Sequence, residues 1–513
     1  MKKRLNHMLS ALPAVLTARH PSGWRWAYAF ALGMALFLAM PNPAPQASVA
    51  VAVNPAPAND PAQLAAADTV QYRLIFAAQD AGDFAAADAH IAQLTNHALL
   101  GHVLAERYLD PRYHASAAQL DQWLDRYRDH PGAARIAKLA NGRGLQLARS
   151  ANALKGSGYI DHLGRSTMPD RWYEALSHWR EADYDAAAPM FLAVADDASL
   201  SDWQRAAGYY WAYRASDRAG ESRAAHRALA HAAEFPTTFY GLLANRAFGT
   251  PDLHASAPKV AENVRRNPHA QRAALLARLT KNDAAEAELR LLYAQVPDKL
   301  RPGIITLASE LNLPNLQVRL ARLPGLSASE SLFAQYPMPG FMVDAQHAVD
   351  PSLLLAIARN ESGFRADVGS SAGARGMMQM LPATARAVER KIGLASLQLA
   401  SNESLSVVER LADPETSVRY GAEYIKLLSA EPAIRGNLVR LLAGYNAGPG
   451  AVASWQRAAA QVDDPLLYIE SIPYAETRNY VMQVMAQYWI YQVLRGEQPA
   501  SLAAMAQGSW PQV

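Results

Sequence analysis

The chain has 513 residues, half of them apolar, so it can bury sizeable cores and form more than one domain. Its formal charge is +3, but residues 1–50 hold five basic residues and no acidic one, so the remainder carries −2 and gives no electrostatic reason to expect a nucleic-acid partner. The absence of cysteine excludes disulfides, a cysteine-linked lipid anchor and zinc sites built on thiolates.

The N-terminus has the organisation of an export signal. Basic residues precede the apolar run "AYAFALGMALFLAM" at 27–40, which is short for a membrane span and typical of a signal peptide. We predict a signal or targeting segment over 1–50, cut after Ala50 or Ala52, with an uncleaved anchor as the alternative. The Pro/Ala-rich stretch up to residue 63 lacks helical periodicity and predicts a disordered linker over 51–63.

Residues 64–330 are helical in pattern almost throughout, because Ala, Leu and Arg dominate and runs of β-branched residues are few. Trp179 and Trp211 lie 32 residues apart in similar positions, close to the length of one tetratricopeptide-like unit. The pattern predicts an α-solenoid. Its helix pairs are expected to meet at the polar turns "DAGD" (80–83), "EADYD" (181–185), "DRAGES" (217–222) and "TKND" (280–283).

Three aspartates spaced four apart, Asp121, Asp125 and Asp129, could be read as a metal-binding face. A solvated helix face is the better interpretation, because these carboxylates lack the turn glycine of a calcium loop. The sequence also contains no HExxH pattern, no phosphate-binding glycine loop and no Gly-x-Ser-x-Gly turn. We therefore predict neither a metal nor a cofactor.

A break in the helical pattern at 323–341, rich in Pro and Gly, marks the start of a compact C-terminal domain over 331–513. Its first strong signal is "VDPSLLLAIARNESGF" (349–364), which predicts a helix with Asp350 as N-cap and Pro351 at the first position. At helical spacing, Glu361 falls on the apolar side of this helix, near its C-terminus.

Burial and the negative end of the helix dipole both disfavour the ionised form of Glu361. We expect its pKa to rise by roughly one to two units above the reference value of about 4.3, so that it can donate a proton near neutral pH. The alternative is a buried structural glutamate that is satisfied by an arginine.

Three further segments carry polar residues suited to a ligand. In "SSAGARGMMQMLPATA" (370–385), small residues precede the amide of Gln379. The segment "LLAGYNAGPGAV" (441–452) ends an apolar helix in a glycine-rich turn, and "YIESIPYAETRNYVMQV" (468–484) places Glu476 at the start of another helix. Taken singly, each of these signals is weak.

Together and in this order, the segments resemble the lytic transglycosylases of bacterial murein, specifically the soluble type. The resemblance rests on Glu361-Ser362, "GARGMMQM", "GYNAG" and "IPYAETRNYV", with Glu361 and Gln379 18 residues apart. It implies an all-α fold, in which an N-terminal superhelix precedes a lysozyme-like catalytic domain. The departures are Leu381, Ser417 and Gly444, at positions where methionine, asparagine and alanine are common in the family.

The resemblance also implies the reaction. Glu361 would protonate the bond between N-acetylmuramic acid and N-acetylglucosamine, the substrate's acetamido group would assist at C1, and Glu361 would then act as base while a 1,6-anhydro ring closes. It further implies peptidoglycan strands as partner, peripheral contact with the envelope, and the periplasm of a Gram-negative cell. A cell-wall synthase or a secretion machine is a possible protein partner.

By position in the family motifs, Gln379 and Ser370 are expected to contact the glycan. Tyr445 is expected to hydrogen-bond beside Glu361 or the N-acetyl group, and Glu476 to fix the loop of Tyr445 or orient the site. Two further residues have open roles. Asn446 either contacts ligand or forms the turn, and Met378 either walls the sugar groove or packs in the core.

Two rival functions remain open at this stage. A lysozyme-like muramidase would share the fold and the acid but activate water, which requires a second carboxylate as base. A non-catalytic scaffold would use the solenoid to recruit partners and the C-terminal domain only to grip glycan.

Overall fold

The computed structural model describes residues 64–141, 168–249, 251–343, 349–397, 404–458 and 462–513. The predicted export segment and linker lie outside these ranges. The described part of the chain is all-α, with isolated bridges and no strand. None of its helices is both long and apolar enough to cross a membrane.

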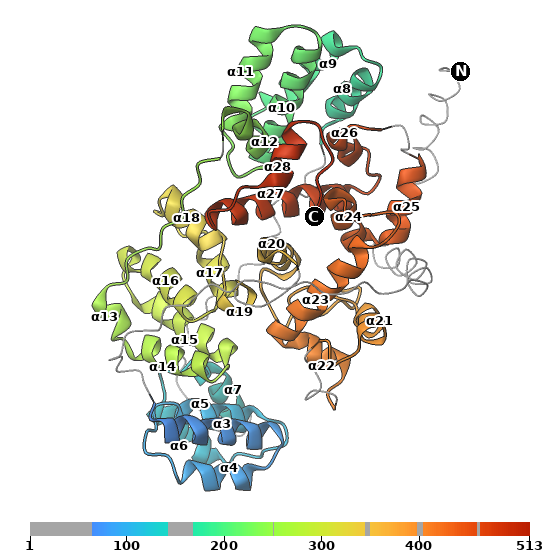
Figure 1. Ribbon diagram of the computed structural model, residues 1–513. Coiled ribbons are helices and arrows are strands. Elements are labelled where there is room, and N and C mark those ends of the chain that lie inside the picture. Colours follow the sequence, from blue (N-terminus) through green and yellow to red (C-terminus); the bar gives the residue numbers. More distant parts are fainter. Residues whose placement is uncertain (1–63, 142–167, 250, 344–348, 398–403, 459–461) are drawn as a thin grey trace.

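The helices up to residue 343 form the N-terminal superhelix (Figure 1). They are α3 (Ala66–Asp80), α4 (Phe84–Ile91), α5 (Leu100–Leu109), α6 (Ala117–Arg126), α7 (Ala133–Asn141), α8 (Asp170–Arg180), α9 (Tyr184–Ala195), α10 (Asp202–Arg218), α11 (Ser222–Ala233), α12 (Phe239–Phe248), α13 (Glu262–Arg265), α14 (Pro268–Arg278), α15 (Asn282–Gln295), η3 (Asp298–Leu300), α16 (Pro302–Glu310), α17 (Pro314–Leu320), α18 (Ala328–Gln335) and α19 (Gly340–Val343).

The remaining helices surround α20 and α27, which pack along each other. They are α20 (Pro351–Ser362), α21 (Pro382–Ile392), α22 (Val407–Ala412), α23 (Pro414–Ser429), α24 (Leu438–Ala447), α25 (Pro449–Ala458), α26 (Pro465–Glu470), α27 (Ala475–Leu494) and α28 (Ala500–Ala506). The boundary expected at residue 331 stays a prediction, because the largest apolar core includes residues on both sides of it.

All four predicted polar turns join antiparallel helix neighbours, and a fifth turn of the same kind joins α16 to α17. Each has a residue in the left-handed conformation two positions after its helix, and the next N–H donates to a carbonyl five residues earlier at 2.8–3.0 Å. This is a Schellman turn. The left-handed residues are Gly82, Ala182, Gly220, Thr280 and Asn312. The repeat is therefore strict in backbone geometry although it is degenerate in sequence.

Trp179 and Trp211 lie on the first helices of two successive pairs, as expected, and their rings meet edge-on at 5.0 Å. The aspartates of α6 and the turn after it show ion pairs typical of a surface. Asp125 binds Arg128 at 2.8 Å, and Asp129 binds Arg272 at 3.0 Å.

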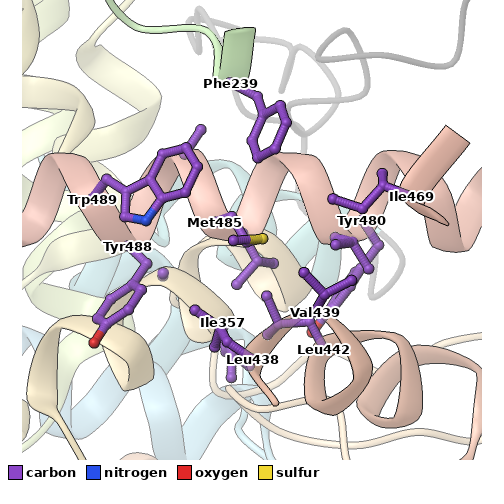
Figure 2. Packing of buried hydrophobic residues seen from close by; sticks show 14 of the residues in the cluster. Phe239, Ile357, Leu438, Val439, Leu442, Ile469, Tyr480, Met485, Tyr488 and Trp489 are labelled. Carbon is purple, nitrogen blue, oxygen red and sulfur yellow. The ribbon is translucent and has the colours of Figure 1, made fainter. Parts of the chain in front are cut away.

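Two parts of the superhelix pack differently (Figure 1). Helices α8–α12 share one apolar core with α20–α28, whereas α3–α5 share a second core with α13–α17. Figure 2 shows α27 between Phe239 of α12 on one side and Ile357 and Leu442 on the other; the Phe239 and Trp489 rings stack at 5.2 Å. The superhelix thus fixes α27, which in turn borders Glu361.

Candidate active site

Helix α20 forms as its sequence predicts. The Asp350 side chain caps the N-terminus by accepting the Ser352 N–H at 2.8 Å, Pro351 occupies the first turn, and Gly363 ends the helix with φ 58°. Leu353, Leu354 and Ile357 are fully buried. Glu361, on the same side, is partly exposed at the end of this stripe. A hydrophobic helix therefore delivers a carboxyl group to the edge of the core.

The surroundings of Glu361 favour its protonated form. Burial raises its pKa to about 8; the Tyr480 hydroxyl offsets part of this rise, and the charge of Glu476 adds to it. The predicted direction is confirmed, and the shift is larger than expected. A carboxyl with this pKa is mostly protonated at neutral pH, so it can act as a general acid.

No arginine satisfies Glu361 in the described part of the chain, contrary to the structural alternative. The nearest one in sequence, Arg359, turns away: its Nε donates to the Gln335 carbonyl at 2.7 Å, and its guanidinium lies 4.5 Å from the centre of the Tyr336 ring. Because no cation among the described residues stabilises the carboxylate, the effect of burial on Glu361 is offset only in part, by the Tyr480 hydroxyl.

Two buried tyrosines border Glu361. Burial and the charge of Glu361 hold the pKa values of both Tyr480 and Tyr445 well above the usual value. Tyr480, on α27, has a hydroxyl that forms no hydrogen bond of normal geometry, although it lies close enough to influence Glu361. Tyr480 was not among the site residues predicted from the sequence. The available signal was its position one helical turn after Glu476.

Tyr445 lies near Glu361 as expected, but its hydroxyl donates to the Met378 carbonyl at 2.9 Å. Ser362 supports the same segment, because its Oγ donates to the Met377 carbonyl at 2.7 Å. Ser417, noted as a family departure, accepts the Met378 N–H at 3.2 Å. Three side chains from three helices thus hold residues 377–378 beside the acid.

The loop between α20 and α21 is compact and locally strained. Phe364 and Gln379 both have positive φ, at 65° and 45°, which non-glycine residues adopt only when their surroundings impose it. Gly376 has φ 75°, and a Cβ there would lie 2.0 Å from the Leu411 carbonyl oxygen. Gly376, the second glycine of "GARG", is therefore required for close packing.

The structure places Gln379 and Ser370 in this loop. Gln379 uses its side-chain amide N–H groups to donate to the Val368 and Gly376 carbonyls, at 3.1 and 2.9 Å, so its carbonyl oxygen is the atom left for a ligand. Ser370 is exposed, and its Oγ accepts the Ala374 N–H at 3.0 Å. Both residues shape the loop, and both remain on its accessible side.

Of the two roles left open for Met378, its contacts favour packing in the core over a wall of the sugar groove. Its side chain is fully buried and lies against Gly421 of α23, so it packs in the core. Asn446 does not form the turn after α24. It lies within α24, where its Oδ1 accepts the Thr477 hydroxyl at 2.6 Å and ties α24 to α27.

Glu476 is exposed in the first turn of α27, and no hydrogen bond joins it to the segment around Tyr445. The link predicted for Glu476 is made by its neighbour Thr477. Glu476 acts on the site through its charge, which raises the pKa of Glu361. Among the described residues, no cluster of three or more histidines and carboxylates is arranged to hold a metal.

Comparison with known proteins agrees with this arrangement. The family described as "Transglycosylase SLT domain" matches residues 341–467. The soluble lytic murein transglycosylase of Escherichia coli is 34% identical over 160 residues, which cover 31% of this chain and 23% of that protein. A putative soluble lytic murein transglycosylase of Haemophilus influenzae is 32% identical over 155 residues, covering 29% and 23%. The aligned part spans less than a quarter of these relatives.

Solved structures extend the likeness over most of the chain. The 70 kDa soluble lytic transglycosylase of Escherichia coli superposes with a TM-score of 0.55 at 17% identity, covering 87% of this chain and 99% of that chain. A complex of the 70 kDa enzyme with bulgecin A gives 0.54 at 20% identity, covering 87% and 64%. At such identities the likeness establishes the fold, a helical superhelix followed by a lysozyme-like domain. Residues 341–467 thus match the transglycosylase SLT domain, and the chain shares its fold, an α-superhelix followed by a lysozyme-like domain, with the solved soluble lytic transglycosylases.

Proposed function

We propose that this protein is a lytic transglycosylase that cleaves the β-1,4 bond between N-acetylmuramic acid and N-acetylglucosamine in peptidoglycan and leaves 1,6-anhydro ends. One observation carries the proposal: Glu361, held without a cation at the end of a buried stripe, has a pKa of about 8. The family match and the two murein transglycosylase relatives support peptidoglycan as the substrate.

In the first step, protonated Glu361 gives its proton to the glycosidic oxygen, and the N-acetylglucosamine side leaves as an alcohol. The acetamido oxygen of the muramic sugar bonds to C1 and forms an oxazolinium ion. Such an internal nucleophile can reach an effective molarity on the order of 10⁵ M, so it takes the place of a second carboxylate.

In the second step, Glu361 is ionised and acts as the base. It takes the proton of the C6 hydroxyl while that oxygen attacks C1, and the bond from C1 to the acetamido oxygen breaks. Water is not consumed, and Glu361 ends in the protonated form in which it began. A pKa close to the working pH suits one residue to both roles.

The surrounding residues receive proposed roles that follow their contacts. The free side-chain oxygen of Gln379 would accept from a sugar amide or hydroxyl, and Ser370 would contact the glycan at the loop surface. Tyr445 would hold the segment of Met378 in place beside the acid, through the hydrogen bond to its carbonyl. Asn446 would position α24 against α27.

Analysis of digested sacculi by mass spectrometry tests the proposal. The wild-type protein should release muropeptides with anhydro ends, which are lighter by one water than reducing ends. Glu361→Gln keeps the size of the side chain but cannot donate a proton, so activity should fall by at least about 10²-fold. Wild-type rates in this variant would refute the assignment of the acid.

A muramidase is the second candidate, and one observation favours it: Glu476 is close enough to act on Glu361 and is exposed. A hydrolase would use such a carboxylate to activate water. Under our proposal, Glu476→Gln lowers the pKa of Glu361 modestly and leaves the products anhydro. Reducing muramic ends from the wild type, abolished in Glu476→Gln, would establish the hydrolase instead.

A non-catalytic scaffold would bind glycan without releasing any product, so the same digest excludes or supports it. Bulgecin A, present in a complex with a structural neighbour, offers a further probe, because it should inhibit release if it binds this site. We also propose a periplasmic location, on the strength of the signal predicted over 1–50. Fractionation of cells that express the full chain tests that location.

A further inference from the structure

An exposed aromatic side chain stands at the N-terminus of α27, the helix that also carries Glu476 and Tyr480. The Tyr474 side chain is 44% exposed, and its ring meets the Trp455 ring edge-on, at 5.3 Å and 89°. Trp455 belongs to α25, which starts directly after the helix that carries Tyr445 and Asn446. Tyr474 is two residues from Glu476, whose charge reaches Glu361.

Tyr474 occupies a position where a different residue type would stabilise the fold. It is the N-cap of the 20-residue helix α27, and its side chain makes no capping hydrogen bond. The neighbouring helices α20, α22, α23, α24 and α26 all begin with an Asp, Ser or Asn whose side chain accepts from a helix N–H. Two further helices of this region, α21 and α28, also begin without a side-chain cap, at Leu381 and Pro499, but only Tyr474 places an exposed aromatic ring at such a position.

Tyr474 also leaves much of its aromatic ring exposed to solvent. A single exposed aromatic residue needs no explanation by itself. Here the ring is held by a second aromatic side chain, it stands where a capping residue would be expected, and it lies two residues before Glu476, whose charge acts on Glu361. Departures from local rules that bring no stability concentrate at functional sites.

We propose that Tyr474, braced by Trp455, is a stacking platform for one N-acetylhexosamine ring of the glycan bound at Glu361. The C–H face of a pyranose is apolar and fits an exposed aromatic ring, while its hydroxyl and acetamido groups remain free for polar partners such as Gln379. The inference rests on the proposed function, because it assumes that glycan binds beside Glu361. It assigns Tyr474 to affinity and Glu361 to chemistry.

Binding of a soluble glycan of alternating N-acetylglucosamine and N-acetylmuramic acid, measured by calorimetry in the Glu361→Gln background, separates affinity from cleavage. Tyr474→Ala should weaken binding about 10-fold, whereas Tyr474→Phe should stay within about 2-fold because the ring remains. Phe248→Ala is the matched control. Phe248 is 54% exposed at the end of α12 and should not change affinity.

Tyr474→Ser distinguishes stacking from a structural effect. Serine supplies the missing cap, so the melting temperature should hold or rise while affinity falls as in Tyr474→Ala. The inference is overturned if Tyr474→Ala and Tyr474→Ser bind like the parent, or if Tyr474→Ser restores affinity. The proposed function fails separately, if the wild-type protein releases no anhydro product from sacculi.

Discussion

Two glutamates in different parts of the molecule, on α15 and on α20, show how surroundings decide what a carboxyl group can do. Glu288, in the superhelix, is fully buried; His102, His269 and Arg272 approach its two oxygens at 2.7, 2.5 and 2.7 Å. Burial alone would raise its pKa, but these hydrogen bonds outweigh burial and hold the pKa well below the usual range. Glu288 is therefore a fixed anion.

Glu361 is only partly exposed at the edge of its core, none of the described residues supplies a cation or a well-formed hydrogen bond to it, and desolvation by its surroundings raises its pKa to about 8. Glu288 joins α15 to α5 and α14, and both of its carboxylate oxygens are engaged in these contacts. Glu361 keeps a proton and the freedom to transfer it. Glu361 differs from Glu288 in having no cation among the described residues to stabilise its charge, and this difference is what suits Glu361 to proton transfer.

The largest expected effect comes from breaking the Glu288 cluster. Glu288→Gln removes the buried anion that His102, His269 and Arg272 share and leaves Arg272 only the exposed Asp129 as counter-ion, so the free energy of unfolding at pH 7 should fall by about 3–5 kcal/mol. Urea denaturation measures this change. The matched control is Glu310→Gln, which removes an exposed ion pair with Arg265 and should cost about 0–1 kcal/mol. Equal effects of the two substitutions would contradict the structural role of Glu288.

Glu361→Gln should change stability in the opposite sense. Because the folded pKa of Glu361 is raised, the folded state holds more protons than the unfolded state between about pH 4.5 and 8, so wild-type stability falls as pH rises through that window. Glutamine removes this loss. The variant should gain more than about 1 kcal/mol relative to the wild type between pH 5 and 8.5 in urea titrations.

A stability difference between Glu361→Gln and the wild type that does not change with pH would count against a raised pKa. For Glu288 the sign reverses. Its depressed pKa adds stability that is fully present above about pH 4.5 and is lost as pH falls further.

A smaller effect is expected from a substitution of Tyr480, whose hydroxyl lowers the pKa of Glu361. Tyr480→Phe removes a group that lowers the pKa of Glu361, so the alkaline limb of the activity profile should move upward by less than about one pH unit. The rate should fall by at most about 5-fold, because a full hydrogen bond is worth about 1 kcal/mol and the Tyr480 hydroxyl has no well-formed one. Tyr491→Phe is the control on the same helix: its buried hydroxyl also lacks a partner, and it packs on Tyr336. Identical pH profiles for both variants would contradict a role for Tyr480.

Much of the fold could be predicted, because its determinants are local. The polar turns of the superhelix each close one helix pair, and Asp350 and Pro351 start α20 as their residue types predict. The raised pKa of Glu361 followed from its place on an apolar stripe. In each case the cause lies within one turn of helix, so sequence spacing is sufficient.

What the sequence could not decide, including the roles left open for Met378 and Asn446, depends on contacts between distant segments. Met378 is buried because Gly421 of α23 leaves room for it, and Asn446 bonds Thr477 across to α27. The contact between Glu288 and His102 joins residues 186 apart in sequence. Neither hydrophobic period nor motif spacing reports which helices meet. For the same reason the influence of Tyr480 on Glu361 was missed, although both lie in segments that the sequence had singled out.

The most direct test is a titration of the Glu361 carboxyl itself, by difference infrared spectroscopy between the wild type and Glu361→Gln. The protonated C=O stretch assigned to Glu361 should persist at pH 7 and disappear with a midpoint near 8. A midpoint near 4.5, with Glu361 ionised throughout the neutral range, would contradict the claim that this residue holds the proton that starts the reaction.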